Sequence, residues 1–110
     1  MRGEARSPVL WGKLAWHPAV KAWTRFAQDG AEPETIEVLR DGNQSATYRL
    51  IGAGSRGEAI IARRARAAKA AIEQAWYRLI HRLVPVKARR YRGSLPGNRG
   101  FVWLFFEDAA

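Results

Sequence analysis

The fold is decided by the stretch EAIIARRARAAKAAIEQAWYRLIHRL, which covers residues 58–83. Its first part, residues 58–64, predicts a short apolar strand that ends in two arginines. Its second part, residues 66–83, predicts a long helix, because alanine has the highest helix propensity and recurs through the first half. Large apolar side chains follow the spacing of a single helical stripe, which predicts one buried face. They are Ile72, Trp76, Leu79, Ile80 and Leu83.

One cation and one anion of this stretch lie on two different rigid elements. Side chains alternate between the faces of a strand, so Arg63 and Arg64 point to opposite faces and one of them faces the helix. Glu73 lies beside Ile72, at the edge of the predicted buried stripe. A strand that presents a cation and a helix that presents an anion can together clamp a phosphate. The alternative is a surface glutamate near several arginines, a contact worth ~0–1 kcal/mol.

The flanking sequence predicts a meander of antiparallel strands. Before the stretch, the period of two predicts strands at 35–40 and 46–51, with turns at 41–45 and 52–57. After the helix, we expect a fourth strand at 86–91, a loop at 92–100 and a fifth strand at 101–106. The fifth strand is so apolar that both of its faces should be buried.

The first 33 residues differ from the rest of the chain. Val20, Trp23 and Phe26 recur at helical spacing, and Pro18 suits a first turn, so residues 18–27 predict a helix. We therefore expect an α+β fold. A five-stranded, mainly antiparallel sheet packed by one long helix should occupy residues 34–110, preceded by an N-terminal helical arm over residues 1–33.

Composition and charge limit the classes of function. The 110 residues predict one small domain, and the absence of cysteine rules out thiolate chemistry and suits a cytoplasmic protein. No apolar run is long enough to cross a bilayer or to form a signal peptide, so we expect no membrane partner. The net charge of +9 is concentrated in residues 56–99, which hold twelve bases and two acids. Such a segment attracts polyanions, or is a solvated basic face.

Two glycine-containing turns are candidate phosphate sites. Residues 52–57, GAGSRG, match the G-x-G-x-x-G pattern of dinucleotide-binding units, but a strand rather than a helix is predicted to follow, which favours a hairpin turn. Residues 41–45, DGNQS, join two strands with small side chains and free backbone N–H groups that can lie over phosphates. The alternative for this second turn is a plain hairpin without a ligand.

In their order and spacing, these elements resemble the N-terminal lobe of a protein-kinase-like phosphotransferase, most closely the aminoglycoside phosphotransferase family. The resemblance covers residues 35–110. It rests on RDGNQSATYRL at 40–50, AIIARR at 59–64, Glu73 and Tyr77 on the helix, residues 85–93, and WLFFED at 103–108.

The resemblance implies that the chain binds ATP as a cofactor. The turn at 41–45 would cover the phosphates, position 63 would contact them and pair with Glu73, and residues 107–109 would hold the adenine. The implied binding residues are Gly42, Asn43, Gln44, Ser45, Arg63, Glu73, Glu107, Asp108 and Ala109.

The chain departs from the family in two ways. Arg63 stands where the family has a lysine, and the two side chains are not interchangeable as phosphate ligands. The chain also stops at the hinge, before the lobe that would supply the catalytic aspartate and the metal ligands. We therefore expect no catalysis by this chain alone, and Mg²⁺ only if such a lobe is supplied. That lobe, or a second copy of the chain, would cover the otherwise exposed strand at 101–106.

Two alternatives remain at this point. The first is a basic, non-catalytic nucleic-acid-binding module, in which Trp76, Tyr77 and Tyr91 stack on bases. The second is an NADP-binding half-domain of Rossmann type that uses residues 52–57, with Arg89 and Arg90 placed for a 2′-phosphate.

Overall fold

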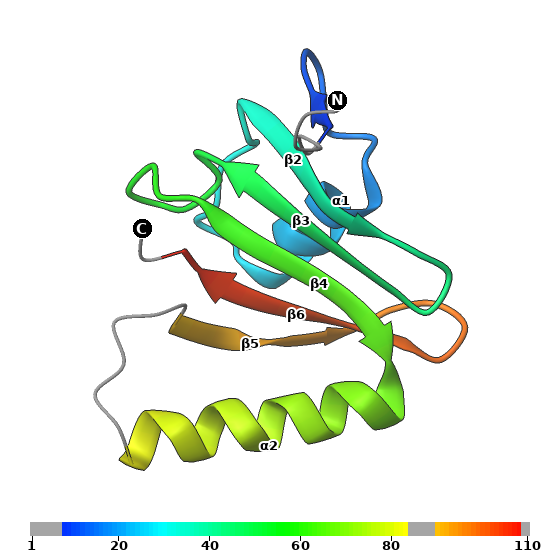
Figure 1. The fold of residues 1–110 in the computed structure, drawn as a ribbon. Helices are drawn as coiled ribbons and strands as arrows, with labels where there is room; N and C mark the ends of the chain where they lie inside the picture. Colours follow the sequence, from blue (N-terminus) through cyan, green and yellow to red (C-terminus); the bar gives the residue numbers. More distant parts are fainter. Residues whose placement is uncertain (1–7, 84–89, 109–110) are drawn as a thin grey trace, which may run out of the picture.

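The computed structural model describes residues 8–83 and 90–108 of the chain. They form one six-stranded antiparallel sheet with strand order β1-β2-β3-β4-β6-β5, together with two helices (Figure 1). The elements are β1 (Val9–Leu10), α1 (Pro18–Phe26), β2 (Thr35–Asp41), β3 (Ser45–Ile51), β4 (Ile60–Arg66), α2 (Ala67–Leu83), β5 (Arg90–Pro96) and β6 (Phe101–Glu107). The predicted α+β class and the antiparallel sheet are confirmed.

The sixth strand comes from the segment predicted to be a helical arm. Val9 and Leu10 pair with Glu37 and Ile36 of β2, and this pairing places β1 at the edge of the sheet. The helix of the same segment, α1, begins at Pro18 as predicted, and the Nδ1 atom of buried His17 caps it by accepting a hydrogen bond from the Ala19 N–H. The N-terminal segment therefore contributes an edge strand to the sheet and a helix that packs on it.

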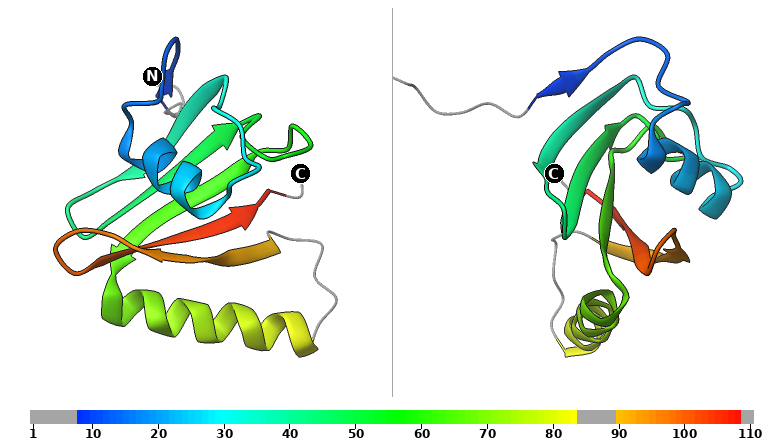
Figure 2. Two further views of the ribbon diagram at one scale, coloured as in Figure 1. Left: turned by 180° about the vertical axis from the view of Figure 1, so that it is seen from behind. Right: turned by 90° about the vertical axis from the view of Figure 1, so that its right-hand side faces the viewer.

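The two helices cover opposite faces of the sheet (Figure 2). On one face, Trp23 of α1 packs in the larger core with Ile36, Leu50 and Phe105. The Trp23 indole N–H also donates to the Ala53 carbonyl, 3.0 Å away, which satisfies its buried polar atom. On the other face, a smaller core contains Ile61, Leu104 and Phe106 beneath α2. Neither helix described in the structure is long and apolar enough to cross a membrane.

β6 has buried side chains on both of its faces, as its apolar sequence predicts. It lies between β4 and β5, so both of its edges are paired. Its buried side chains alternate between the two cores: Trp103 and Phe105 lie on the α1 face, and Leu104 and Phe106 on the α2 face. The expectation that this strand is exposed is wrong, because the larger core with α1 covers one of its faces and the smaller core with α2 covers the other. A covering lobe or a second copy of the chain stays a prediction.

The strand before β6 begins later than predicted. The predicted strand at 86–91 falls largely on residues 84–89, which lie outside the described residues, and β5 continues to Pro96 through the predicted loop. A register shift between Tyr91 and Gly93 bends this strand. Gly93 has a φ of 147° and faces the Phe26 ring, where an added Cβ would lie 2.8 Å from Cζ. Because Gly93 has no side chain, Phe26 of α1 can approach β5 closely at this position.

α2 has the predicted length, but the first three residues of its predicted buried stripe are exposed, and the side chains of the other two, Ile80 and Leu83, lie outside the described part of the chain. The exposed fractions of Ile72, Trp76 and Leu79 are 71%, 57% and 48%. The side chains that face the sheet are instead Ala70 and Tyr77 of the smaller core, together with Glu73. The helix begins at Ala67 directly after the last residue of β4, Arg66, so no linker lets it rotate. Chain connectivity therefore fixes the face that α2 presents to the sheet.

Candidate functional site

Arg63 and Glu73 form a bidentate ion pair between β4 and α2. The Nε and Nη2 atoms of Arg63 donate to Oε1 and Oε2 of Glu73, and both distances are 2.8 Å. The Nη1 atom also donates to the Thr47 hydroxyl on the adjacent strand β3, at 3.2 Å. The expectation that one arginine of the pair faces the helix is confirmed: Arg63 does, whereas the Arg64 guanidinium lies 4.8 Å from the Phe101 ring centroid.

The ion pair is partly open to solvent. The side chains of Arg63 and Glu73 are 18% and 19% exposed. The hydrogen bonds from Glu73 raise the pKa of Arg63 above its usual value, and burial only partly opposes this rise. A guanidinium carries five N–H groups, and three of those on Arg63 are engaged. Two donors are therefore left to contact an anion while the pair stays formed.

The turn between β2 and β3 lies at the end of β4 beyond Arg63. The Gly42 N–H donates to the Ser45 carbonyl at 2.9 Å, and the buried Ser45 hydroxyl accepts from Arg40 Nε at 3.0 Å. Gln44 accepts from Arg66 Nε at 3.1 Å, while Asn43 is exposed. Of the four predicted binding residues in the turn, Asn43 thus keeps its side chain available to a ligand, whereas Gln44 and Ser45 connect the turn to neighbouring side chains.

The predicted adenine-binding residues lie at the opposite end of the sheet. Glu107 forms an ion pair with Arg92 at 2.7 Å, and the Asp108 N–H donates to the Ala59 carbonyl at 3.0 Å. Ala109 lies outside the described residues. Five residues of register separate the turn end from this end, which at ~3.3 Å per residue is roughly 16 Å. Arg63 lies between the two ends.

Two residues that the sequence analysis did not select line the same face. Thr47 and Arg49 are two positions apart on β3, so their side chains point to the same face of the sheet. Their partners on β4 are Arg63 and Ile61. Arg49 forms ion pairs with Glu37 on β2 at 2.7 Å and with Asp108 at 2.8 Å. The opposite charges of Glu37 and Arg49 on two strands joined by a hairpin were the available signal. Arg49 ties the predicted adenine end to the centre of the sheet.

The glycine loop at residues 52–57 connects two antiparallel strands, β3 and β4. Hydrogen bonds from the N–H of Gly54 to Glu58 and from the N–H of Gly57 to Gly54 close it, each at 2.9 Å. Gly52 and Gly57 both have a φ of 81°, which a tight turn requires. A dinucleotide-binding loop opens into a helix, so the Rossmann-type geometry expected for this loop is wrong and the hairpin interpretation is confirmed.

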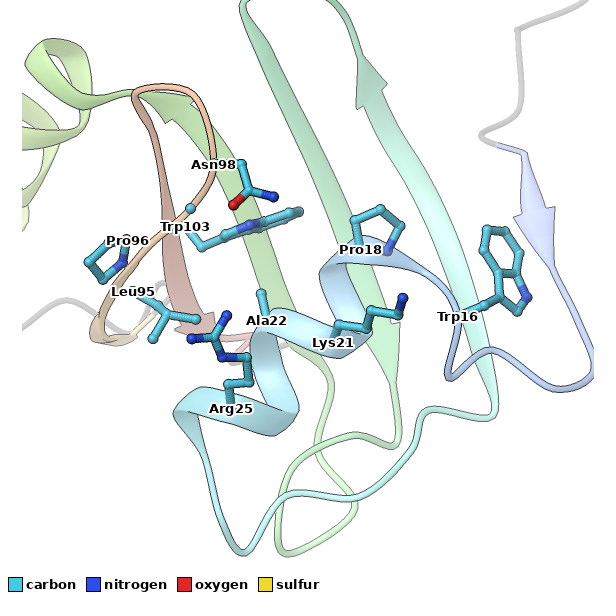
Figure 3. Close-up of a pocket in the computed structure, with 10 residues that line it drawn as sticks. Trp16, Pro18, Lys21, Ala22, Arg25, Leu95, Pro96, Asn98 and Trp103 are labelled. Atoms are coloured by element: carbon cyan, nitrogen blue, oxygen red, sulfur yellow. The ribbon is translucent and has the colours of Figure 1, made fainter.

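A pocket of about 350 Å³ lies on the opposite face of the sheet, between α1 and the β5–β6 hairpin (Figure 3). None of the predicted binding residues lines it. The lining residues are Trp16, Pro18, Lys21, Ala22, Arg25, Leu95, Pro96, Gly97, Asn98 and Trp103. The sequence analysis missed this site, because its residues come from segments about 70 positions apart.

Within the described part of the chain, no group of three or more side chains is arranged to hold a metal ion. Comparisons with protein-family models, with curated proteins and with solved structures give no match for this chain.

Proposed function

We propose that this chain is a nucleotide-binding lobe, similar to the ATP-binding lobe of aminoglycoside phosphotransferases. The observation that carries the proposal is the bidentate pair of Arg63 and Glu73, which joins a strand to a helix and keeps two guanidinium N–H groups free. Glu73 would hold the guanidinium in one orientation, so that its remaining donors face the phosphates with little loss of side-chain entropy.

The residues on either side of Arg63 fit this role. Toward the turn, the exposed side chain of Asn43 offers its amide N–H groups to the phosphates. At the other end of the sheet, Glu107 and Asp108 lie about 16 Å from the turn, a length of the order of an extended nucleoside triphosphate. Asp108 is held there by Arg49. The proposal concerns binding, with no transfer step assigned to this chain.

The proposal is tested by calorimetry with ATP and Mg²⁺. We expect the wild-type chain to bind, and Arg63→Ala and Glu73→Ala each to weaken binding at least about tenfold, or ~1.4 kcal/mol. Arg56→Ala is the matched control, because it removes one exposed cation from the β3–β4 turn without touching the pair. Unchanged affinity in both site variants would reject the clamp.

A second function is favoured by the exposed aromatic on α2. Trp76 is 57% exposed, and Lys69 and Arg78 on the same helix are also exposed, which suits stacking and phosphate contact with single-stranded nucleic acid. Tyr77 and Tyr91 cannot join it as predicted, because both pack against Phe106. Affinity for an oligonucleotide that falls steeply with salt and is lost in Trp76→Ala would support this function.

A further inference from the structure

The pocket between α1 and the β5–β6 hairpin has the composition of a small-molecule site. Its volume of about 350 Å³ lies in the range of ligand pockets, and most of its lining is aromatic or aliphatic. Trp103 is buried, while Trp16 is 60% exposed. The indole N–H of Trp103 donates to no other residue in the described part of the chain. A planar apolar ligand would thus meet two indoles and one free donor.

The charged groups of this pocket have one sign. Lys21 and Arg25 are four residues apart on α1, so both side chains lie on one face of the helix and flank the pocket (Figure 3). No acidic residue lines the pocket. Neither cation forms an ion pair or a side-chain hydrogen bond with any residue that the structure describes. An anionic group bound beside either side chain would therefore gain a charged partner without breaking an existing ion pair.

The walls of the pocket are fixed before any ligand arrives. The His17 cap sets the start of α1, and the Lys21 N–H donates to the His17 carbonyl at 3.0 Å. On the hairpin side, the Gly97 N–H donates to Phe101 at 2.9 Å and the Phe101 N–H to Asn98 at 3.1 Å, which holds the Asn98 turn. A preformed site loses little entropy on binding.

We propose that this pocket binds a small planar aromatic acid, with its ring against Trp16 and Trp103 and its acidic group between Lys21 and Arg25. The Asn98 side chain, which lies over Trp103 in Figure 3, supplies a further polar contact at the rim. This site lies on the face of the sheet opposite to Arg63, and it does not depend on nucleotide binding.

Three probes with one ring system and different charge test the proposal by calorimetry: 2-naphthoate, 2-naphthalenemethanol and 2-naphthylmethylamine. We expect 2-naphthoate to bind with a dissociation constant on the order of 0.1 mM, and the neutral and cationic probes to bind at least about tenfold more weakly. Lys21→Met and Arg25→Met should each weaken naphthoate binding about three- to tenfold. Lys13→Met, an exposed loop cation that does not line the pocket, should leave it unchanged.

Equal binding of the three probes, or unchanged naphthoate affinity in both pocket variants, would overturn the proposal. Trp16→Ala adds a check on the ring contact, because this exposed side chain can be removed without opening the core. It should weaken all three probes alike. Arg63→Ala should bind naphthoate as the wild-type chain does, and Arg25→Met should bind ATP unchanged, so failure of one site is separable from failure of the other.

Discussion

Arg63 and Glu73 lie face to face, with two parallel hydrogen bonds of 2.8 Å between the β4 guanidinium and the α2 carboxylate. This contact fixes α2 in position as well as in rotation. Four residues further along the helix, Tyr77 packs edge-on against Phe106, with ring centroids 4.7 Å apart. Glu73 and Tyr77 therefore hold one face of α2 on the sheet, by charge and by aromatic packing.

The ion pair should contribute measurably to stability. In a double-mutant cycle of Arg63→Ala and Glu73→Ala, we expect a coupling energy of about 1–2 kcal/mol, because the pair is bidentate and mostly shielded from water. Arg63→Lys should lose part of this coupling, since lysine cannot form both bonds in one plane. Urea unfolding measures each free energy. A coupling energy near zero would show that solvent screens the pair.

The sequence predicted that one of the two β4 arginines faces the helix, which is confirmed for Arg63, but it predicted the wrong face of the helix. Strict alternation on β4 was enough to separate Arg63 from Arg64, since a strand has only two faces. The rotation of α2 could not be predicted from its apolar stripe, because two sets of residues at helical spacing compete for the sheet. Ile72, Trp76 and Leu79 form the larger set, yet the direct β4–α2 connection selects the face of Glu73 and Tyr77.

The two faces of α2 should respond differently to substitution. Ile72→Gln and Leu79→Gln should each change the unfolding free energy by less than about 0.5 kcal/mol, because both side chains are largely in water. Tyr77→Ala should cost ~2–3 kcal/mol, since it removes the Tyr77 ring from its packing against both Phe106 and Tyr91. Chemical unfolding followed by circular dichroism measures all three. A larger loss for Ile72→Gln than for Tyr77→Ala would contradict this rotation of the helix.

Gly30 lies so close to Trp23 that a side chain at position 30 should destabilise the fold. A methyl group at position 30 would overlap the indole and lie 2.9 Å from its Cε2 atom, and Trp23 is fixed by its bond to Ala53. Gly30→Ala should therefore destabilise the fold by ~1–3 kcal/mol. The same change in a Trp23→Leu background should cost clearly less, because the overlap is then removed. Additive effects in the double variant would show that the backbone at Gly30 moves away.

The N-terminal segment shows why part of the fold was out of reach of sequence analysis. The 18–27 helix was predictable from its own spacing and from Pro18. Its docking site was not, because Trp23 and Phe26 pack on Phe105, which lies about 80 residues away. The pocket could not be predicted for the same reason: Lys21 and Arg25 line it only because α1 lies beside the β5–β6 hairpin, which is distant in the sequence.

The His17 cap should make the fold sensitive to mild acid. Nδ1 of this buried imidazole accepts the Ala19 N–H at 3.1 Å, a role that only the unprotonated nitrogen can fill. Burial lowers the pKa of His17, and the nearby charge of Asp41 only partly opposes this shift. The unfolded chain therefore binds a proton more readily than the folded one. Stability is complete above the unfolded pKa of about 6.5 and is lost as the pH falls through the folded pKa.

The matched variant for this prediction is His17→Asn, because asparagine is a good helix N-cap and does not titrate. We expect the wild-type unfolding free energy to fall between pH 7 and pH 5, while that of His17→Asn changes less over the same range. The difference between the two chains isolates the imidazole, since the carboxylates are common to both. Urea unfolding at several pH values measures it. Parallel curves would mean that His17 either titrates equally in both states or is replaced as a cap when it is protonated.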